Sequence, residues 1–353
     1  MAELAFLSVD DATAADLEWP DVYFTPAYGH ACEASDGASW EVAVGAGGGI
    51  LFPYLRRAVD SELCGSDAAF DIVSPYGYAG TWVAPGVGQA EVTRFRDSLR
   101  AALAARGGVA EFHRTSGLVP GRAEVAEADP ALVHEQLHDT VAIDLSRGYE
   151  ACWAAAEGRS RTKTRKALKK GYSDRHRVAS SSDLSHGGAF RDLYESTMRR
   201  VDARPYYLFP NAYYERLQAG LGADLGLVEI LDPEGAVSGA GIYFVHGALL
   251  HLHLVGSTRD SQRDGAGNLL YDSVIRYGCE RGMSTLHVGG GMAADDAMFK
   301  FKRSFGGHRV PFHVARGILD PTRYETLVAA RAAATERTVE AVRGTGYFPA
   351  YRG

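Results

Sequence analysis

The chain has 353 residues, of which 46% are hydrophobic and 23% charged, with 37 Lys and Arg against 44 Asp and Glu and a formal net charge of −7. This composition is typical of a core-forming protein of about two domains, and it excludes a disordered or collagen-like chain. The negative charge argues against a surface coated in cations for indiscriminate nucleic-acid binding, but not against a local basic footprint. Lysine is rare and confined to two short segments, at Lys163, Lys166, Lys169, Lys170, Lys300 and Lys302.

The sequence carries no signal for membrane insertion, export or metal binding. It has no run of 18 apolar residues, and residues 1–20 lack the basic start, apolar stretch and cleavage site of a signal peptide. We therefore expect a cytoplasmic protein without a membrane span. The cysteines are far apart in the sequence and form no C-x-x-C motif, so neither a disulfide framework nor a zinc site is indicated for Cys32, Cys64, Cys152 and Cys279.

In the first half, strand-like runs at Trp40–Val44 and Ile50–Leu55 are joined by a glycine-rich turn, which predicts a β-hairpin. A strand at Val109–His113 and an apolar run at Val141–Leu145 follow later, and Ser146 is expected to cap the next helix. Between them a helix is expected, because apolar residues recur at helical spacing at Val92, Phe95, Leu99 and Leu103.

The second half repeats this order. Leu225–Leu231 and Val237–Val245 flank a tight turn, and Leu249–Val255 follows as a third strand. A helix from about Gly267 to Arg281 then leads into a strand at Thr285–Val288. Because each half has hairpins, a helix that ends in Arg-Gly and a further strand, the sequence predicts two similar α/β domains with a boundary near Leu145.

The segment from Arg159 to Arg177 has the most unusual composition, with nine cations and one acid, Asp174. As a helix ending at Gly171 it would stack like charges four residues apart, which costs about 0.2–0.5 kcal/mol per pair. It offers only Ala167 and Leu168 for burial, so core packing does not explain it. A solvated charged face is one interpretation, and a site for a polyanion such as RNA is the one we favour. The expected RNA-contacting residues are Arg161, Lys163, Arg165, Lys166, Lys169 and Lys170.

Two glycine-containing motifs have the composition of ligand-binding loops. Ser74–Gly80 combines a proline with two glycines and two aromatic residues, which suits either close approach of a ligand or a tight turn. The motif Q-x-x-G-x-G, from Gln262 to Gly267, stands between a strand and a helix, where backbone N–H groups can receive a phosphate. Its three fixed positions are Gln262, Gly265 and Gly267.

A further motif combines cations with aromatic anchors. Phe299–Gly306 follows three consecutive glycines, and its phenylalanines are expected to fix the backbone while a lysine remains polar. A lysine ammonium beside a buried carbonyl can stabilise the oxyanion of a tetrahedral intermediate. His251 and His253 alternate with leucines and face the same side of a strand, as a packed or cleft-lining pair without a third metal ligand.

These segments together resemble the Fem family of aminoacyl-tRNA-dependent peptidyltransferases, which belong to the GNAT-like acyltransferases. The ending G-G-G…F-K-x-x-F-G is the most specific part of the resemblance, whereas the first 65 or so residues and the last 35 or so contribute little. The matching segments are Asp71–Gly80 (DIVSPYGYAG), Ser160–Gly171 (SRTKTRKALKKG), Phe190–Arg200 (FRDLYESTMRR), Tyr206–Phe209, Leu249–Ser257 (LLHLHLVGS), Asn268–Gly282 and Leu286–Gly306.

The resemblance implies an α/β (α+β) fold of two GNAT-like domains, each a mixed, mostly antiparallel sheet flanked by helices, with a cleft between them. Residues 1–145 would form the acceptor side, and residues 146–353, with the basic segment and a C-terminal helix, the donor side. The implied activity moves an amino acid from its tRNA ester to an amine, and Lys302 beside Phe301 would steady the negative charge that develops on the carbonyl oxygen. The acceptor would be held near Tyr76, Gly77, Tyr78, Arg199, Arg200, Tyr207 and His253.

The chain also departs from the family pattern. Gly80–Ala84 replaces the Gly-Pro-x-x-Asp of the wall-building enzymes, so the aspartate sometimes proposed as a base is missing. A neutral amine can attack an activated ester without one. The acceptor is then either a cell-wall precursor or a small amine or peptide, as in antibiotic assembly.

We expect a monomer that uses aminoacyl-tRNA as the donor, with no cofactor and no metal. The Q-x-x-G-x-G motif supports an alternative, an acyl-CoA-dependent GNAT N-acyltransferase. A non-catalytic RNA-binding module is a second alternative, although it would have no need of a lysine held between phenylalanines.

Overall fold

The computed structural model describes residues 4–65 and 68–353. The chain forms two compact units, unit 1 with residues 1–137 and 312–353, and unit 2 with residues 138–311. The division expected from the sequence, at residue 145, leaves the C-terminal segment with the second domain, whereas residues 312–353 pack with unit 1. The reason is a long-range strand pairing in which Ala315 lies opposite His113.

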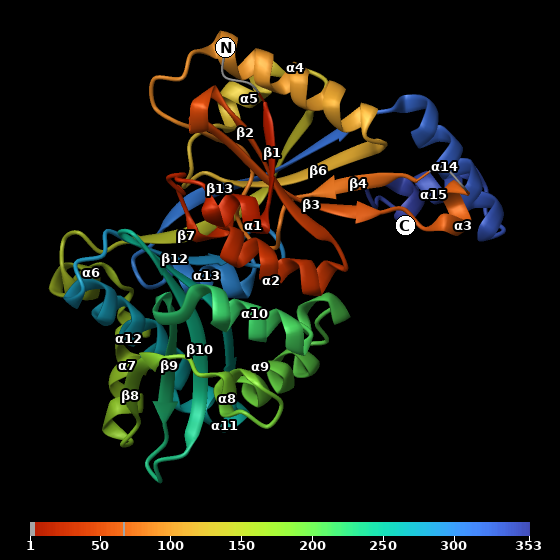
Figure 1. The fold of residues 1–353 in the computed structure, drawn as a ribbon. Helices are drawn as coiled ribbons and strands as arrows, with labels where there is room; N and C mark the ends of the chain where they lie inside the picture. Colours follow the sequence, from red (N-terminus) through yellow and green to blue (C-terminus); the bar gives the residue numbers. More distant parts are fainter. Residues whose placement is uncertain (1–3, 66–67) are drawn as a thin grey trace. The chain divides into compact units, whose positions relative to one another are not determined.

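Unit 1 is built on a mixed sheet with the strand order β1-β2-β3-β4-β6-β13, and β5 also pairs with β3 (Figure 1). All neighbours are antiparallel except β4 and β6, which are parallel. The elements are β1 (Ala5–Ser8), α1 (Val9–Ala14), η1 (Val22–Phe24), α2 (Pro26–Asp36), β2 (Ser39–Gly45), η2 (Ala46–Gly48), β3 (Ile50–Ala58), α3 (Ser61–Cys64), β4 (Phe70–Val73), β5 (Trp82–Val83), α4 (Gln89–Ala105), β6 (Gly108–Ser116), α5 (Arg122–Ala128), β13 (His308–Ile318), α14 (Pro321–Ala334), α15 (Val339–Arg343) and η5 (Ala350–Arg352).

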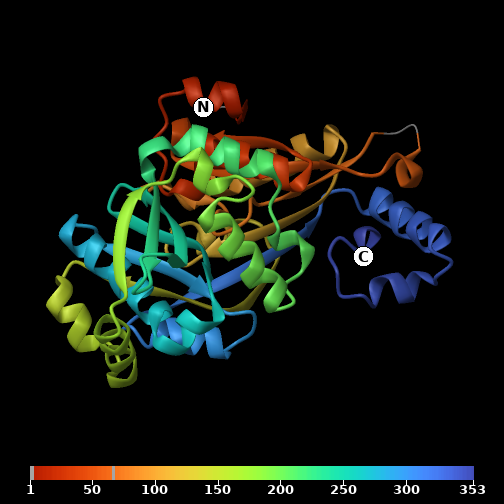
Figure 2. The ribbon, with the colours of Figure 1, turned by 90° about the horizontal axis from the view of Figure 1, so that it is seen from below.

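The predicted hairpin and helix of the first half are confirmed as β2, β3 and α4. The helix buries the expected apolar residues against the inner face of the sheet, including Val92, Leu99 and Leu103. The C-terminal helices form a second apolar cluster around Tyr324 and Val328, and in the view of Figure 2 they are the dark blue elements that gather at one end of unit 1.

The strands of unit 2 have the order β7-β12-β11-β10-β9-β8, in which only β11 and β12 are parallel neighbours. The elements are β7 (Val133–Asp144), α6 (Tyr149–Ala155), α7 (Gly158–Lys169), β8 (Ser173–Val178), α8 (Ser181–Leu184), α9 (Ala189–Arg200), η3 (Pro205–Tyr207), α10 (Asn211–Leu221), η4 (Gly222–Asp224), β9 (Leu225–Leu231), β10 (Val237–His246), β11 (Leu249–Ser257), α11 (Arg259–Asp264), α12 (Ala266–Glu280), β12 (Thr285–Gly290) and α13 (Ala297–Arg303).

Helices cover both faces of the unit 2 sheet. Helices α7 and α12 share an apolar cluster with one face, in which Ala167, Leu269 and Val274 are buried beside Val228 and Leu250. Helix α9 packs on β10 and β11, and Figure 1 shows it across these strands from α7 and α12. The strands and the helix predicted for the second half are confirmed to within a few residues.

Two local predictions are wrong. Helix α6 begins at Tyr149 with Gly148 as its N-cap, and the Ser146 hydroxyl instead donates a hydrogen bond to Asp144 (2.6 Å). The Q-x-x-G-x-G segment is not an open loop, because its first three residues belong to the short helix α11, which ends at Asp264.

Neither described part of the chain, 4–65 or 68–353, contains a helix with the length and apolar character needed to cross a lipid bilayer.

A buried ion-pair network ties α4 to the unit 1 sheet. The Arg96 side chain is fully buried, and its Nη2 donates hydrogen bonds to both oxygens of Glu111 (3.0 Å each) and to Asp129 (2.9 Å). Burial alone would raise the pKa of Glu111, but Arg96 and His113 hold it well below its usual value. Removing one partner of such a network leaves an uncompensated buried charge.

We predict that Arg96→Ala lowers the free energy of unfolding of unit 1 by about 3–5 kcal/mol, because Glu111 and Asp129 lose their shared cation. Chemical unfolding measures this change. The matched control is Arg94→Ala on the exposed side of the same helix, with an expected effect within about 0.5 kcal/mol. A loss below about 1 kcal/mol for Arg96→Ala would contradict the argument.

Candidate active site

Lys302 is held at the point where β12 ends. Its Nζ donates a hydrogen bond to the carbonyl of Gly290, the last residue of β12 (2.7 Å). Burial lowers the pKa of Lys302 to about 8, partly offset by the charge of Asp296. An ammonium donates three hydrogen bonds, so the Gly290 carbonyl fixes its place while two N–H groups remain for another acceptor.

The segment between Gly290 and α13 is organised by Asp296. This residue is the N-cap of α13, and its carboxylate accepts hydrogen bonds from the backbone N–H groups of Phe299 (2.7 Å) and Met292 (2.6 Å). These bonds lower its pKa, which keeps the cap ionised. Asp296 therefore fixes the start of the helix that carries Lys302 and supplies a negative charge near its ammonium.

Aromatic rings hold α13 on the other side. Phe301 contacts Tyr271 and Phe305 edge to face, with ring centroids 5.1 and 5.3 Å away, and Phe305 stacks on Tyr271 at 5.2 Å. Phe299 is also buried. As expected from the sequence, the phenylalanines of this motif pack against other rings, and Lys302 forms a polar contact.

Buried polar side chains line the sheet beside Lys302. Thr140 donates a hydrogen bond to the carbonyl of Val310 (3.3 Å), so its hydroxyl oxygen accepts one from Nε2 of His287 (2.9 Å). Nδ1 of His287 then faces Nδ1 of His251 at 3.4 Å as an acceptor. Burial, followed by the charges of His251 and Lys302, lowers the pKa of His287 well below its usual value, so this ring is neutral.

The other acceptor-site residues predicted in unit 2 are not all in one place. Tyr207 approaches the segment after β12, with its hydroxyl 4.0 Å from the Met292 sulfur. His253 lies under α10, where Nε2 is 2.9 Å from the Tyr213 hydroxyl, and burial lowers its pKa to about 3. Arg199 pairs with Glu195 (2.6 Å).

Arg200 has a structural partner as well. Its Nη2 donates a hydrogen bond to the carbonyl of Ser257 (3.0 Å), which ties the end of α9 to the end of β11. The contacts of Arg199 and Arg200 join α9 to Glu195 and to the end of β11, and their role in acceptor binding stays a prediction.

Tyr76, Gly77 and Tyr78 belong to unit 1. The Tyr76 carbonyl accepts a hydrogen bond from the Tyr28 hydroxyl (2.7 Å), and the Tyr78 ring packs edge to face on Tyr23 at 5.4 Å. Gly77 lies against the same Tyr23 ring, so closely that an added Cβ would be 2.4 Å from it. The turn is thus packed on its inner side, and its role in acceptor binding also stays a prediction.

The basic helix α7 has a buried face that the sequence analysis missed. Ser160, Thr164 and Ala167 are buried, whereas Leu168 is exposed. These small side chains let α7 pack closely on α12. Core packing therefore does contribute to the position of this segment, contrary to the prediction from the sequence. The spacing of Ser160, Thr164 and Ala167, four and then three residues apart, could have predicted this buried face. A search for large apolar residues does not detect such a pattern.

The stacked cations of α7 share partners in pairs. Arg161 donates hydrogen bonds to the carbonyls of Trp153 (3.2 Å) and Ala154 (3.1 Å), and Arg165 lies over the Trp153 ring at 5.1 Å. On another face, Lys166 and Lys170 both contact Asp264. A shared acceptor offsets the repulsion between like charges four residues apart.

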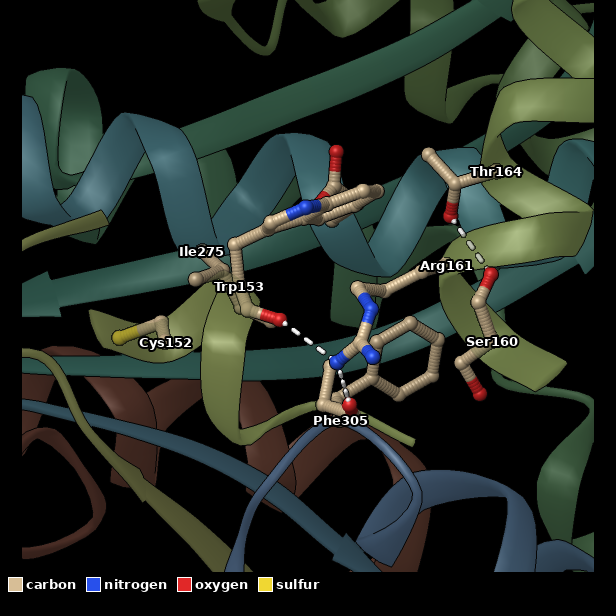
Figure 3. A pocket seen from close by; sticks show the side chains of 9 residues that line it. Cys152, Trp153, Ser160, Arg161, Thr164, Ile275 and Phe305 are labelled. Atoms are coloured by element: carbon tan, nitrogen blue, oxygen red, sulfur yellow. Dashed lines mark hydrogen bonds between the residues drawn. The ribbon is translucent and has the colours of Figure 1, made fainter. Parts of the chain in front are cut away.

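Arg161 is therefore used inside the protein. Figure 3 shows its guanidinium reaching into a small pocket between Trp153 and Phe305 and toward the Trp153 carbonyl. The pocket is lined by Cys152, Trp153, Ala156, Ser160, Arg161, Thr164, Asp272, Ile275 and Phe305. Because its guanidinium donates hydrogen bonds to carbonyls in the last turn of α6, Arg161 is a weaker candidate for RNA contact than the exposed lysines.

Lys163 and Lys169 are the most available cations of α7. Both side chains are exposed, and within the described part of the chain neither forms an ion pair that the structure records.

Helix α7 is joined directly to the Lys302 segment. Ser160 and Ser304 are both buried, and their hydroxyl oxygens are 2.6 Å apart. The backbone N–H of Glu157, just before α7, donates a hydrogen bond to the Ser304 carbonyl (2.8 Å). Ser304 is the C-cap of α13, so the start of the basic helix and the end of the lysine-bearing helix share one residue.

The Q-x-x-G-x-G residues lie against α7 instead of facing open space. Gly265 has a φ of +95°, and an added Cβ would be 2.4 Å from the Lys163 carbonyl. Gln262 is also occupied, since its Nε2 donates a hydrogen bond to the Ser257 hydroxyl (2.9 Å). Gly267 lies in the first turn of α12. Helix α7 therefore covers Gly265. The phosphate-binding role of Gln262, Gly265 and Gly267 stays a prediction.

Among the described residues, no group of three or more His, Cys, Asp or Glu side chains is placed to hold a metal ion.

Residues 158–303 match the family model of the acetyltransferase (GNAT) domain. The matched segment lies within unit 2, and the match supports an acyltransferase. The mixed strands and flanking helices of both units are consistent with a tandem GNAT-like architecture. No curated protein sequence gave a significant match.

Comparison with solved structures extends the likeness in fold to most of the chain. FemX superimposes with a TM-score of 0.68 at 13% identity, covering 92% of this chain and 99% of FemX. L-PGS from Bacillus licheniformis gives 0.54 at 12% identity, covering 90% of this chain and 98% of that one. A tandem GNAT protein from the clavulanic acid biosynthesis pathway gives 0.54 at 12% identity, covering 91% and 99%. At these identities the likeness concerns the fold alone, and the chain shares the overall architecture of FemX and of a tandem GNAT protein.

We predict that Lys302 titrates near pH 8, because burial of its ammonium lowers the pKa. Labelling at different pH values with an amine-acylating reagent, followed by mass spectrometry of the Lys302 peptide, measures the midpoint. Asp296→Asn should lower the midpoint further, since it removes the negative charge that favours the ammonium. Asp295→Asn, at the exposed neighbouring position, is the matched control and should leave it in place. A midpoint near the ordinary lysine value of about 10.5 would mean that the ammonium is solvated.

Proposed function

We propose that the protein is an aminoacyltransferase that moves an amino acid from aminoacyl-tRNA to the amine of a small or peptidyl acceptor, forming a peptide bond without a ribosome. The observation that carries this proposal is the junction at Ser304. It joins Lys302, a desolvated ammonium with two N–H groups to offer, to α7, the helix with the highest density of cations in the chain. The likeness to FemX supports the same assignment at the level of fold.

In the proposed reaction the neutral amine of the acceptor attacks the carbonyl carbon of the aminoacyl ester. A C–N bond forms, and the carbonyl oxygen takes up the negative charge of the tetrahedral intermediate. Lys302 donates a hydrogen bond to that oxygen. The intermediate collapses when the C–O bond to the terminal ribose breaks, and the proton lost by the amine ends on the ribose hydroxyl, by way of water or the substrate itself.

Burial gives the Lys302 ammonium its effect. A charge-assisted hydrogen bond is stronger where water is excluded, and the aromatic contacts of Phe301 and the Gly290 carbonyl keep the ammonium in one place. With a pKa of about 8 it remains mostly protonated at neutral pH and loses its proton above pH 8. The protonated Lys302, which is the hydrogen-bond donor, is therefore present at a pH at which part of the acceptor amine is neutral.

The polyanionic donor is expected along the exposed side of α7. Lys163 and Lys169 are exposed there, and Lys166 and Lys170 are each about half exposed. Tyr76, Gly77 and Tyr78 of unit 1 are proposed for the acceptor amine, which is a cell-wall precursor or a small amine or peptide of antibiotic assembly. The proposal places the reaction in the cytoplasm, where charged tRNA is available.

An acyl-CoA donor is the second candidate, because the matched family model is that of an acetyltransferase domain. The contacts of its expected pyrophosphate site argue against it. The Lys163 carbonyl lies against Gly265, and the Asp264 carboxylate stands next to it, so an arriving pyrophosphate would meet a backbone oxygen and a negative charge. A non-catalytic RNA-binding module would leave the buried ammonium of Lys302 without a purpose.

We predict that Lys302→Met lowers aminoacyl transfer at least about tenfold, a cautious value for the loss of one oxyanion donor. The unfolding temperature should stay close to that of the wild type, because a methionine fills the same space. Lys300→Met is the matched control, since Lys300 lies on the exposed side of the same helix and should retain normal turnover. Wild-type turnover in Lys302→Met would remove this lysine from the mechanism.

Donor competition tests the proposed function itself. The protein is given a mixed extract of acceptors with labelled aminoacyl-tRNA, and in a parallel sample with labelled acyl-CoA. We expect labelled product only with aminoacyl-tRNA, and none after the donor has been treated with ribonuclease. Product from acyl-CoA alone would instead establish the N-acyltransferase.

A further inference from the structure

We propose that Asp264 is a built-in counterion that masks Lys166 and Lys170 of α7, so that only a ligand carrying several closely spaced phosphates displaces it and engages the whole basic face. This inference rests on the proposed function, because it concerns how the RNA part of the donor is recognised. It assigns a selectivity role to a residue that lies inside the motif expected to bind a phosphate.

The contacts of Asp264 define the mask. One carboxylate oxygen, Oδ1, accepts a hydrogen bond from Nζ of Lys170 and lies 3.4 Å from Nζ of Lys166. The other, Oδ2, is 3.4 Å from the Tyr172 hydroxyl. Hydrogen bonding from Lys170, and then from Lys166, lowers the pKa of Asp264, which is therefore ionised wherever the lysines are charged.

The end of α11 adds to this effect. Nζ of Lys166 also donates a hydrogen bond to the carbonyl of Arg263 (2.8 Å), in the last turn of that helix. Carbonyl groups at a helix C-terminus attract cations. Both ammonium groups are thus drawn toward α11, and an incoming phosphate must compete with a carboxylate and a carbonyl for them.

The position of Asp264 is fixed by its neighbour. Gly265 adopts a positive φ and lies against the Lys163 carbonyl, where a Cβ would be 2.4 Å from that oxygen. This close contact holds the end of α11 on α7. The Asp264 carboxylate consequently stays within reach of Lys166 and Lys170 until a ligand competes for the two ammonium groups.

The mask separates ligands by their number of phosphates. A single phosphate that reaches Lys166 and Lys170 exchanges one anion for another and gains little. A nucleic-acid strand also meets the exposed Lys163 and Lys169, whose neutralisation releases counterions without any competing carboxylate. The combined contacts of a polyanion then make displacement of Asp264 favourable.

Equilibrium binding of a fluorescent RNA hairpin shaped like a tRNA acceptor stem, measured over a range of salt concentrations, tests the proposal. Asp264→Asn should tighten binding about twofold to tenfold at low salt, the range expected when one or two exposed ion pairs no longer compete. The slope of log K against log salt should be the same for both proteins, because the hairpin displaces Asp264 from the lysines in the wild type and neutralises the same number of phosphates.

Two controls make the effect specific. Asp260→Asn removes the same charge from the same helix at a site that is 91% exposed and 3.5 Å from Arg263, so it should change the affinity far less. In the background Lys166→Met with Lys170→Met, Asp264→Asn should have no further effect on RNA binding, because there is nothing left to unmask. Thermal unfolding of each variant confirms that the fold is retained.

The outcomes separate this inference from the proposed function. If the wild type binds the hairpin and Asp264→Asn binds it equally or more weakly, the mask is refuted while the RNA-binding proposal stands; weaker binding would mean that Asp264 positions the lysines for the ligand. An equal gain from Asp260→Asn would reduce the effect to overall charge and also refute the mask. If no variant binds the hairpin even at low salt, both proposals fail.

Discussion

A pair of buried hydroxyls determines how the chemistry-bearing parts of unit 2 are arranged. Ser160 starts the buried face of α7, Ser304 is the C-cap of α13, and their hydroxyl oxygens are 2.6 Å apart. The second bond, from the Glu157 N–H to the Ser304 carbonyl, fixes the direction in which α7 leaves this point. A buried hydroxyl without a partner is costly, so the pair strongly favours the position in which both helices are found. The basic face of α7 and the ammonium of Lys302 are consequently held in a constant relation to each other.

The polar groups around Lys302 likewise hold a side chain in a fixed position. The ammonium is kept by one carbonyl and one nearby carboxylate, and the rings of Phe301 and Phe305 shield the helix that carries it. His287 stays neutral through burial and through its hydrogen bond with Thr140, so it adds no positive charge that would further disfavour the ammonium. The negative charge of Asp296 thus favours the positive charge of the Lys302 ammonium, and the neutral His287 does not oppose it.

The sequence predicted those helices and strands that have one apolar face. It did not predict which residues are buried where the buried side chains are small or polar. The strands β9, β10 and β12 and the helices α4 and α12 were predicted nearly to their ends, since their hydrophobic periods are regular. Helix α7 was correctly located, but its buried face was missed because serine, threonine and alanine carry no hydrophobic signal. Strand β13 was not predicted at all, and its pairing with β6 is long-range. In the site, the F-K-x-x-F-G motif indicated Lys302, but its partners Gly290, Asp296 and Ser304 depend on tertiary contacts that no local pattern encodes.

The two sides of α7 differ in the side chains that their surroundings can accommodate. On the inner side, Ser160, Thr164 and Ala167 have no room to grow, since a larger side chain would push the helix off α12 and carry Ser304 with it. On the outer side, the side chains of Lys163 and Lys169 are exposed. The outer cations can therefore be replaced without disturbing the position of the lysine on α13.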